Sequence, residues 1–518
     1  MQQQPTAIWL NSIEDITAQD DPLKLGLSEH LDAALSQQRY LQSLDSDQQV
    51  APMTVVLGIN NMPDQECAAF STDGKLIQVG HDHVAYSNDV YGLGYAKYRD
   101  EYIKPITQIL TDDKYKSLRI VSILEPNSFV NMLINTNEAP LTNSSPLNPF
   151  NAELSSAGYC DKILNFNNET IMPSVVGEGS ANNPNLGLYA GAIRLAIKEM
   201  HNAYLINNNI YTYLDIGQAN LLGHDREIDI TEDYEGYEDP DFSDGIADSL
   251  QTKMKRTARF YKQLIDGADG VLDSKGLDWI KGFTSNIGGY IPTEEPLISN
   301  SMEILDLQKL DLFYEYNPSV DEMSYIDYLK TYFTTSDPDG FFGTQKFEDI
   351  GFIIDTSRNG WGALGDARPK PGEGKKGLDS NKRVDTRAHR GHWCNANDAG
   401  IGEVPRADPD STRSHLDAFY WLSTPGFSDG ISFDISDFYL DSPSYNRLDE
   451  IDKSVVEQSY SIIFTRFIDT MCISGENRED VIVETIPAMA PKKGVWFHKQ
   501  FIMLLENAHP KLGESDYE

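Results

Sequence analysis

The stretch LRIVSILEPNS, residues 118–128, is an apolar run that stops abruptly at a polar group. A short apolar run of this kind is typical of a buried parallel strand, whose two faces are both covered. Similar runs lie at residues 53–59, 210–216, 279–283, 350–354 and 416–422. The stretch at 118–128 is therefore predicted to be one strand of a larger parallel sheet.

Stretches with helical periodicity separate these runs, notably residues 188–204 and 246–265. Strands that alternate with helices form parallel sheets with crossover helices, so the sequence predicts an α/β fold. We find no repeat of fixed period and no Pro-rich or Gly/Ser-rich linker. One domain is therefore expected over residues 1–518.

Polar side chains stand where most of the predicted strands stop. A parallel barrel brings its strand ends together on one face, where residues distant in sequence line a single cleft. Any one of these residues has an ordinary alternative as a turn or helix-capping residue, but the whole set predicts a functional site. Its members are Asn60, Glu125, Asn127, Asp215, Asn286, Asp355, Arg358 and Asp429.

The composition is strongly acidic, with 80 Asp and Glu against 42 Lys and Arg. The resulting formal net charge of -38 repels a phosphate backbone, so no nucleic-acid partner is expected. No apolar run is long enough to span a membrane, so a soluble protein is expected. The acidic stretch at residues 225–244 is interpreted as solubilising surface. His81 and His83 are interpreted as part of a solvated loop, because no third metal ligand accompanies them.

Residues 124–128, together with MPDQECAA at residues 62–69, resemble the paired signatures of the family 6 glycoside hydrolases, which include cellulases. Further motifs follow in that family's order, and the resemblance extends from about Pro5 to Leu512. They are YLDI at 213–216, GFTSN at 282–286, DTSRNGWG at 355–362, HWCN at 392–395, SDG at 428–430 and GVWF at 494–497.

The resemblance implies a distorted parallel (β/α) barrel, with loops that roof the strand ends into a tunnel. It implies hydrolysis of β-1,4-glucosidic bonds with inversion, no metal, no cofactor, and a β-glucan or related polysaccharide chain as the partner. A monomer is expected. Residues 372–390 and 432–487 stand where bacterial cellobiohydrolases of the family carry the tunnel loops, and the second segment is longer than the family pattern.

The four cysteines match the two disulfides of the family, which would pair Cys67 with Cys160 and Cys394 with Cys472. Disulfides persist in oxidising compartments, so the resemblance implies a secreted, extracellular protein. The alternative is that the cysteines are reduced and buried. Their spacing fits no zinc motif.

Inverting hydrolysis needs one carboxylic acid that protonates the leaving oxygen, and a second group, roughly 6.5 to 9.5 Å away, that activates water. Asp429 matches the family's candidate base. Asn127 stands at the acid position, and its amide has no titratable proton to give. Glu66 replaces the aspartate that tunes the family's acid, and we hypothesise that it supplies the proton instead. Alternatively, Asn127 deamidates in part next to Ser128 and regenerates an aspartate.

Several sugar-binding positions of the family are also changed. Asn60 replaces a tyrosine, Gln218 a histidine, Ser423 a lysine and Phe427 a glutamate. Trp393 is the best remaining side chain for stacking on a pyranose ring. The predicted substrate-binding residues are Asn60, Asp215, Gln218, Asn286, Arg358, Trp393 and Ser423. The tryptophans expected in the core are Trp9, Trp361, Trp421 and Trp496.

Two functions follow from these assignments. The first is a secreted hydrolase of the cellulase type that breaks down polysaccharides, with Asp429 as base and a relocated acid. The second is a catalytically degenerate protein that holds a glucan chain without cutting it. The family resemblance favours the first function and Asn127 favours the second, so both stay open.

Overall fold

The computed structural model describes an eight-stranded sheet, helices around it and many of the loops at the strand ends. The residues described are 7–19, 23–44, 51–63, 76, 96–128, 189–219, 258, 261, 265, 276–295, 319–334, 349–362, 384–385, 387, 393–430, 433–434, 473–474 and 490–512.

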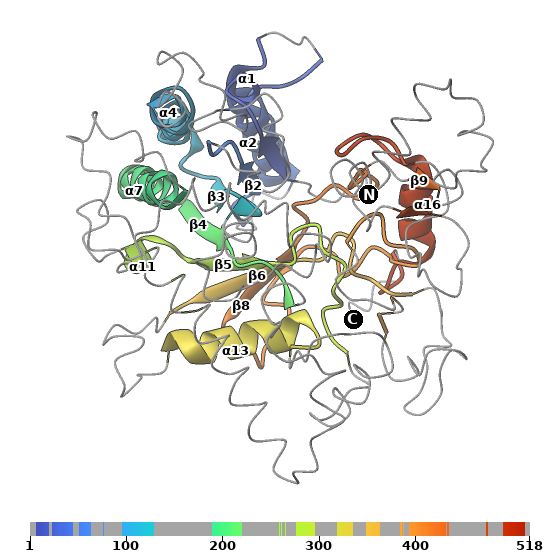
Figure 1. The fold of residues 1–518 in the computed structure, drawn as a ribbon. Coiled ribbons are helices and arrows are strands. Elements are labelled where there is room, and N and C mark those ends of the chain that lie inside the picture. The colour runs from blue at the N-terminus through green and yellow to red at the C-terminus, as the bar shows by residue number, and fades with distance from the viewer. Residues whose placement is uncertain are drawn as a thin grey trace, which may run out of the picture.

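The sheet consists of parallel strands with one short antiparallel strand at its edge, in the order β1-β2-β3-β4-β5-β6-β8-β7 (Figure 1). The strands are β1 (Ile8–Leu10), β2 (Thr54–Ile59), β3 (Arg119–Leu124), β4 (Ile210–Asp215), β5 (Gly282–Ser285), β6 (Gly351–Asp355), β7 (Arg406–Ala407) and β8 (Leu416–Tyr420). From β1 to β6, sheet neighbours are also successive strands in the chain. The loops that follow these strands therefore leave the sheet at the same edge.

The sheet curls so that β1 approaches the residues that follow β8. The backbone N–H of Ala7 donates to the carbonyl of Trp421 at 3.3 Å, and the indole N–H of Trp9 donates to the carbonyl of Leu422 at 2.8 Å. The apolar cluster inside the curl is built from Ile123, Tyr213, Ile353, Tyr420 and Leu422. The fold is thus a distorted barrel with a packed interior, as predicted.

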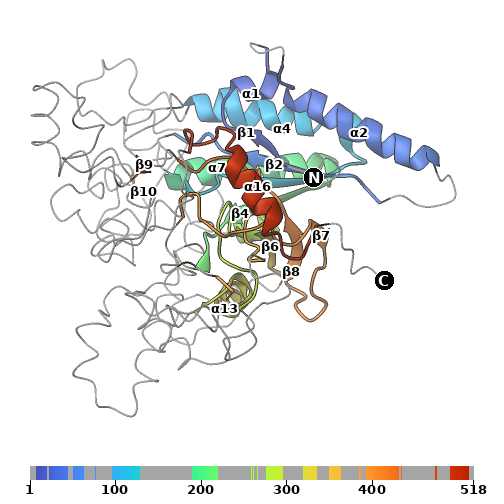
Figure 2. The ribbon, with the colours of Figure 1, turned by 90° about the vertical axis from the view of Figure 1, so that its right-hand side faces the viewer.

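Helices cover the outside of the barrel. They are α1 (Glu14–Thr17), α2 (Leu27–Leu44), the π-helical turn η1 (Tyr98–Ile103), α4 (Lys104–Leu110), the 3-10 turn η2 (Asp113–Tyr115), α7 (Tyr189–Asn207), α11 (Gly276–Trp279), α13 (Glu322–Thr334) and α16 (His498–Glu506). In both ribbon views α2 and α4 lie on one side of the sheet and α13 on the other (Figures 1 and 2). Strand residues alternate accordingly: Ile123 faces the interior cluster, whereas Ile120 and Leu124 belong to the core under the helices.

The strand predicted at residues 279–283 is displaced in the structure. Trp279 ends α11, and β5 begins only at Gly282. The Trp279 ring stacks on the ring of His201 in α7, with centroids 4.6 Å apart. Trp279 therefore packs between α11 and α7 and not in the sheet. The strand itself is confirmed, but its predicted start was wrong, because an apolar side chain in a short run does not show whether it is buried in a sheet or under a helix.

The outcome of the other predictions of helices and strands depends on the length of the element. The helix predicted at residues 188–204 is confirmed as α7, whereas most of the helix predicted at 246–265 lies outside the described residues. The strands β1 and β7 were not predicted, because three and two residues are too few to show a periodic pattern. Long patterned segments were therefore identified more securely than short edge strands.

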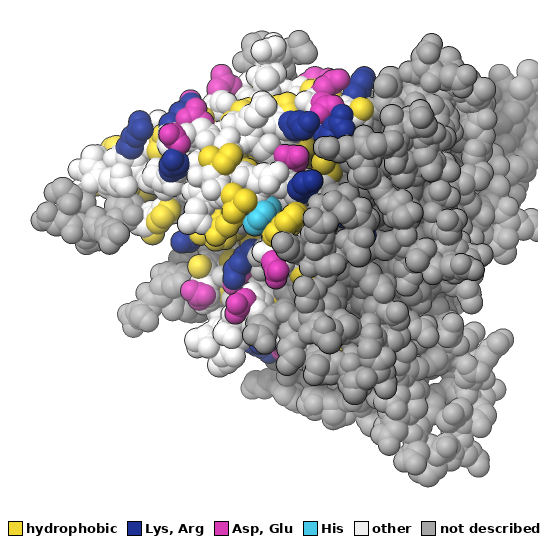
Figure 3. Space-filling view, turned by 90° about the vertical axis from the view of Figure 1, so that its left-hand side faces the viewer, with side chains coloured by type: hydrophobic (Ala, Val, Ile, Leu, Met, Phe, Trp, Pro, Cys, Tyr) yellow, Lys and Arg dark blue, Asp and Glu magenta, His cyan; other side chains and the backbone are white. Residues whose placement is uncertain are grey.

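The outer face on the side of α4 and α7 shows acidic and basic side chains interspersed among its described residues (Figure 3). Exposed ion pairs in the helical layer include Lys104 with Asp100 and Lys114 with Asp32. Such pairs contribute little to stability, because water screens them. Among the helices that the structure describes, none combines the length and apolar character needed to cross a bilayer.

Candidate active site

Buried carboxylates at the strand ends hold the loops of neighbouring strands. Glu125 follows β3 and accepts the backbone N–H groups of Asn61 and Met62, in the loop after β2, at 3.3 and 2.9 Å. Asp215 ends β4 and accepts the backbone N–H of Asn127, in the loop after β3, at 2.6 Å. Each loop is thereby tied to the end of the next strand.

Asp355, at the end of β6, ties two further loops. Its Oδ2 accepts the backbone N–H groups of Gly288, after β5, and Ser423, after β8, at 3.2 and 3.0 Å. Its Oδ1 accepts the N–H of Ser357 at 2.9 Å. Burial raises the pKa of Asp355, and the donors offset only part of that rise. The loops after β5 and β8 are thus brought together through one side chain.

Asp215 is 1% exposed, and both of its oxygens are occupied. Gly217 donates its N–H to Oδ1 at 2.8 Å, opposite the contact from Asn127. Burial raises the pKa of Asp215 to about 6, although these two donors lower it in part. Asp215 was predicted to bind substrate. The structure shows it holding the backbone of Asn127, and a direct sugar contact stays a prediction.

Four residues at this edge adopt a left-handed backbone. The φ angles are 46° at Glu125, 65° at Asn127, 60° at Asn286 and 46° at Asn395. This region is uncommon for residues other than glycine, although asparagine tolerates it better than most, and such residues cluster at functional sites. The strand-end carboxylates and amides thus lie on loops whose shape is imposed by their tertiary contacts.

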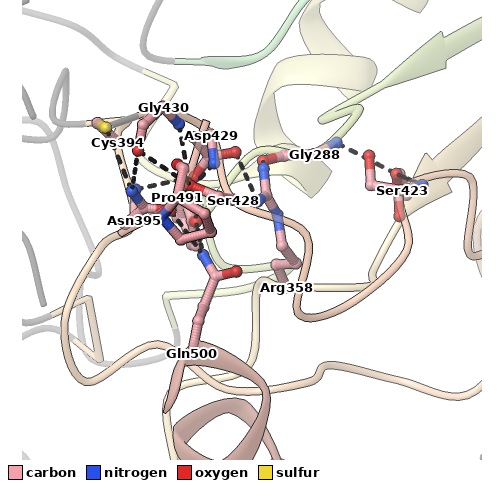
Figure 4. Close-up of polar contacts among 12 residues, drawn as sticks. Gly288, Arg358, Cys394, Asn395, Ser423, Ser428, Asp429, Gly430, Pro491 and Gln500 are labelled. Atoms are coloured by element: carbon pink, nitrogen blue, oxygen red, sulfur yellow. Dashed lines mark hydrogen bonds and ion pairs between the residues drawn. The ribbon is translucent and has the colours of Figure 1, made fainter. Parts of the chain in front are cut away.

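Asp429, in the loop after β8, has its carboxylate held by three donors, of which Arg358 and Asn395 are labelled in Figure 4. Arg358 Nη1 donates to Oδ1 at 2.6 Å. The hydroxyl of Tyr290 and the backbone N–H of Asn395 donate to Oδ2 at 2.6 and 2.8 Å. Each carboxylate oxygen accepts about two hydrogen bonds, so the contacts among the described residues leave one acceptor position on Oδ1. The Asp429 side chain is 13% exposed, so water can reach the carboxylate.

The guanidinium of Arg358 is almost wholly buried beside Asp429. Its Nη2 donates to the carbonyl of Gly288, and its carbon Cζ lies 4.6 Å from the centroid of the Tyr290 ring. Burial lowers the pKa of Arg358, but Asp429 and Tyr290 raise it by more, so the side chain stays charged. A shielded ion pair therefore fixes the direction of the Asp429 carboxylate.

A closed ring of hydrogen bonds continues behind Asp429. The backbone N–H of Asp429 donates to Asn395 Oδ1 at 3.0 Å. Gln500 Nε2 donates to that same oxygen at 3.3 Å and to the hydroxyl of Tyr290 at 3.1 Å. Sequence reasoning missed Tyr290, Asn395 and Gln500 as site residues. The HWCN motif contains Asn395 and was a usable signal, whereas no pattern in the sequence marks Gln500.

The predicted substrate-binding residues fall into two groups by exposure. Those partly open to solvent are Asn60, Gln218, Trp393 and Ser423. The buried ones are Asp215, Asn286 and Arg358. Asn286 uses its amide nitrogen internally, donating to the carbonyls of Ile291 and Asp355 at 3.0 and 3.2 Å. The sugar contacts of both groups stay predictions, and the open group has the better access to a ligand.

The prediction that Trp496 lies in the core was wrong. Trp361 and Trp421 are 2% exposed, as expected, but Trp496 is 44% exposed. An isolated β-bridge joins Trp496 to Phe427, and the two rings meet edge to face with centroids 6.2 Å apart. The pairing holds Trp496 at the surface next to the loop that carries Asp429.

Several predicted residues and segments lie outside the described residues. They are Glu66, Cys67, Cys160, Cys472, His81, His83, residues 225–244, and most of residues 372–390 and 432–487. Cys394 is buried and disulfide-bonded, while its pairing with Cys472 stays a prediction. Within the described ranges, no group of three or more His, Cys, Asp and Glu side chains is placed to hold a metal ion.

Comparisons with known proteins point to one family. Residues 1–149 and 187–444 match the profile of a family described as "Glycosyl hydrolases family 6". Over 517 residues the chain is 28% identical to exoglucanase A of Cellulomonas fimi, covering 98% of this chain and 44% of that protein. It is 20% identical to the 1,4-beta-D-glucan cellobiohydrolase CEL6B of Podospora anserina over 425 residues, which are 82% of this chain and 66% of the relative. The chain thus spans less than half the length of exoglucanase A.

Solved structures agree with the sequence relatives. The catalytic domain of Cellulomonas fimi Cel6B superposes with a TM-score of 0.62 at 27% identity, covering 98% of this chain and 86% of that one. A glycoside hydrolase family 6 enzyme from Coprinopsis cinerea, CcCel6C, superposes with a TM-score of 0.50 at 19% identity, covering 98% of this chain and 87% of that chain. The second likeness supports the fold alone.

Replacing Asp215 with Asn should alter the pH dependence of stability. The pKa of Asp215 is raised from 3.8 to about 6 in the folded protein, so the folded state binds this proton more readily than the unfolded state. The contribution of Asp215 to the free energy of unfolding is therefore complete below about pH 4, and it is lost as the pH rises through about 6. In urea denaturation, wild type should lose about 3 kcal/mol relative to Asp215→Asn between these limits. A pH-independent difference would contradict the raised pKa, and Asp113→Asn, at an exposed carboxyl, is the control.

Asn127 should remain an amide in the purified protein. Deamidation requires the backbone nitrogen of the next residue to attack the side-chain amide. Ser128 N instead donates to the carbonyl of Glu125 at 3.1 Å, and the φ of 65° at Asn127 is fixed from the other side by Asp215. Peptide mass mapping after incubation at neutral pH should find only the asparagine form. Accumulation of the aspartate form would restore the deamidation hypothesis.

Proposed function

This chain belongs to family 6 of the glycosyl hydrolases, and on that premise we propose that it is a secreted hydrolase of β-1,4-linked glucans that acts with inversion. The named relatives are an exoglucanase and a 1,4-beta-D-glucan cellobiohydrolase, which supports a glucan chain as the substrate. Polysaccharide breakdown would then be its role.

The observation that carries the proposal is the arrangement around Asp429. A water-activating base must present an unoccupied oxygen in a fixed direction. Arg358, Tyr290 and Asn395 hold three of the acceptor positions of Asp429 and leave one on Oδ1. In the proposed mechanism a water molecule donates one proton to Oδ1 while its oxygen attacks the anomeric carbon.

The proton for the leaving oxygen must come from a group other than Asn127. The amide of Asn127 has no acidic proton, and loss of a general acid costs on the order of 10² to 10⁴ in rate. Glu66 is the candidate replacement, because it follows closely after Asn61 and Met62, the loop residues that Glu125 holds. In this scheme Glu66 is a carboxylic acid that loses its proton to the glycosidic oxygen as the bond to the anomeric carbon breaks.

A glucan-binding protein without hydrolytic activity is the second candidate function. The exposed amide of Asn127 at the acid position favours it. The partly open residues, among them Gln218, Trp393 and Ser423, would then contribute to holding the chain rather than to a reaction. Both functions predict that the protein binds a glucan chain, but only the hydrolase predicts a cleaved product.

Wild type and three variants, incubated with a panel of β-1,4-linked and mixed-linkage glucans, should separate the two functions. Reducing ends and binding are measured in parallel. Wild type should release product slowly, and Asp429→Asn and Glu66→Gln should abolish release while binding persists. Asn127→Asp restores a titratable group at the acid position and should raise the rate by up to about 10² to 10⁴-fold.

The outcomes differ clearly. Binding without product from wild type, together with product from Asn127→Asp, would establish the glucan-binding function. Wild-type activity that survives Glu66→Gln would remove Glu66 as the acid and leave the hydrolase assignment in place. Neither binding nor product on any glucan would overturn both functions. Asn127→Ala is the matched control, since it removes the amide without adding a carboxyl.

A further inference from the structure

The C-terminal helix α16 inserts one polar side chain behind the candidate base. Gln500 is polar but 0% exposed. The other fully buried side chain of this helix, Leu504, packs in an apolar cluster with Trp361 and Trp421. Gln500 Oε1 is buried and has no hydrogen-bond partner in the part of the chain that the structure describes. Burying an amide with an unsatisfied oxygen is costly. An apolar side chain would therefore serve the packing of α16 better.

The two protons on Gln500 Nε2 are both used. One goes to the hydroxyl oxygen of Tyr290 at 3.1 Å and the other to Asn395 Oδ1 at 3.3 Å. Asn395 Oδ1 can only accept, so the nitrogen of the Gln500 amide must face it. The reversed amide would bring two oxygens together and is excluded by their repulsion.

This orientation decides where the single proton of Tyr290 points. The hydroxyl oxygen of Tyr290 accepts from Gln500, so its own proton is directed to Asp429 Oδ2, at 2.6 Å. The second contact steadies Asn395, whose backbone N–H donates to that same Asp429 oxygen at 2.8 Å. Gln500 therefore supports both hydrogen bonds on Oδ2 indirectly, through Tyr290 and Asn395.

We propose that Gln500 is a positioning residue for Asp429: its amide fixes the Tyr290 proton and the Asn395 loop, so that Oδ2 stays occupied and Oδ1 is the oxygen that receives water. The inference rests on the proposed function, because it assigns Asp429 the task of activating that water. It also gives α16 a part in the reaction chemistry, at a distance in sequence of about seventy residues from Asp429.

Gln500→Met tests the inference, because Met has nearly the same shape and lacks both donors. Without them, Tyr290 and Asn395 lose their fixed directions and Asp429 is held less firmly as a carboxylate. We expect kcat to fall by up to about 10²-fold, as small misplacements at a reacting group do. KM should be unchanged, because Gln500 is fully buried and cannot contact a bound chain.

The split between kcat and KM supplies a readout that a purely structural role would not give. The charged or titratable side chains that contact Asp429 in the described parts of the chain are Arg358 and Tyr290. Leu504→Met is the matched control on the same helix, and its kcat and KM should equal those of wild type.

Crystal structures of both variants keep this inference separate from the proposed function. In Gln500→Met the 2.6 Å contact between the Tyr290 hydroxyl and Asp429 Oδ2 should lengthen or be lost, while Leu504→Met retains it. An inert wild type would refute the hydrolase assignment, and the structures would still decide whether Gln500 orders the carboxylate. A retained contact in Gln500→Met, or an unchanged kcat in an active enzyme, would overturn the inference.

Discussion

Carboxylates buried at the strand ends are the constraint on which the shape of the site depends. A loop that runs over the mouth of a barrel exposes backbone N–H groups that need acceptors, and a buried carboxylate needs donors. Glu125, Asp215 and Asp355 satisfy both needs at once, because each accepts N–H groups from the loop of a neighbouring strand. The desolvation of these groups is visible in the raised pKa of Asp215 and of Asp355.

Asp429 differs from these three carboxylates in both exposure and partners. It is partly open to solvent, and a buried arginine is among the groups that hold it. Arg358 and Tyr290 reach it from the loops after β6 and β5, and Gln500 supports Tyr290 from α16. The base is thus built from four segments of the chain, and its direction depends on how those segments pack.

The acid position retains its support although its side chain has changed. The backbone of Asn127 is held by Asp215 in a left-handed conformation that asparagine tolerates well. Asn127 is exposed, and the contact that fixes its conformation is made by its backbone N–H. An aspartate and an asparagine would therefore occupy this position with the same fold, and the exchange affects chemistry far more than stability.

The sequence by itself determined the parallel barrel and the strand ends at which the polar residues gather, because burial on both faces of a strand leaves an apolar run. The family was evident from the order of its motifs along the chain. The sequence did not determine the boundary of β5, the exposure of Trp496 or the place of Gln500, since each depends on a partner far away in the chain: His201 for Trp279, Phe427 for Trp496, and Tyr290 with Asn395 for Gln500. Only the tertiary structure decided which strand-end carboxylates hold loops and which one faces solvent. The residue type is aspartate in both roles, so the sequence does not distinguish them. The role follows from the hydrogen-bond donors that packing brings to each carboxylate.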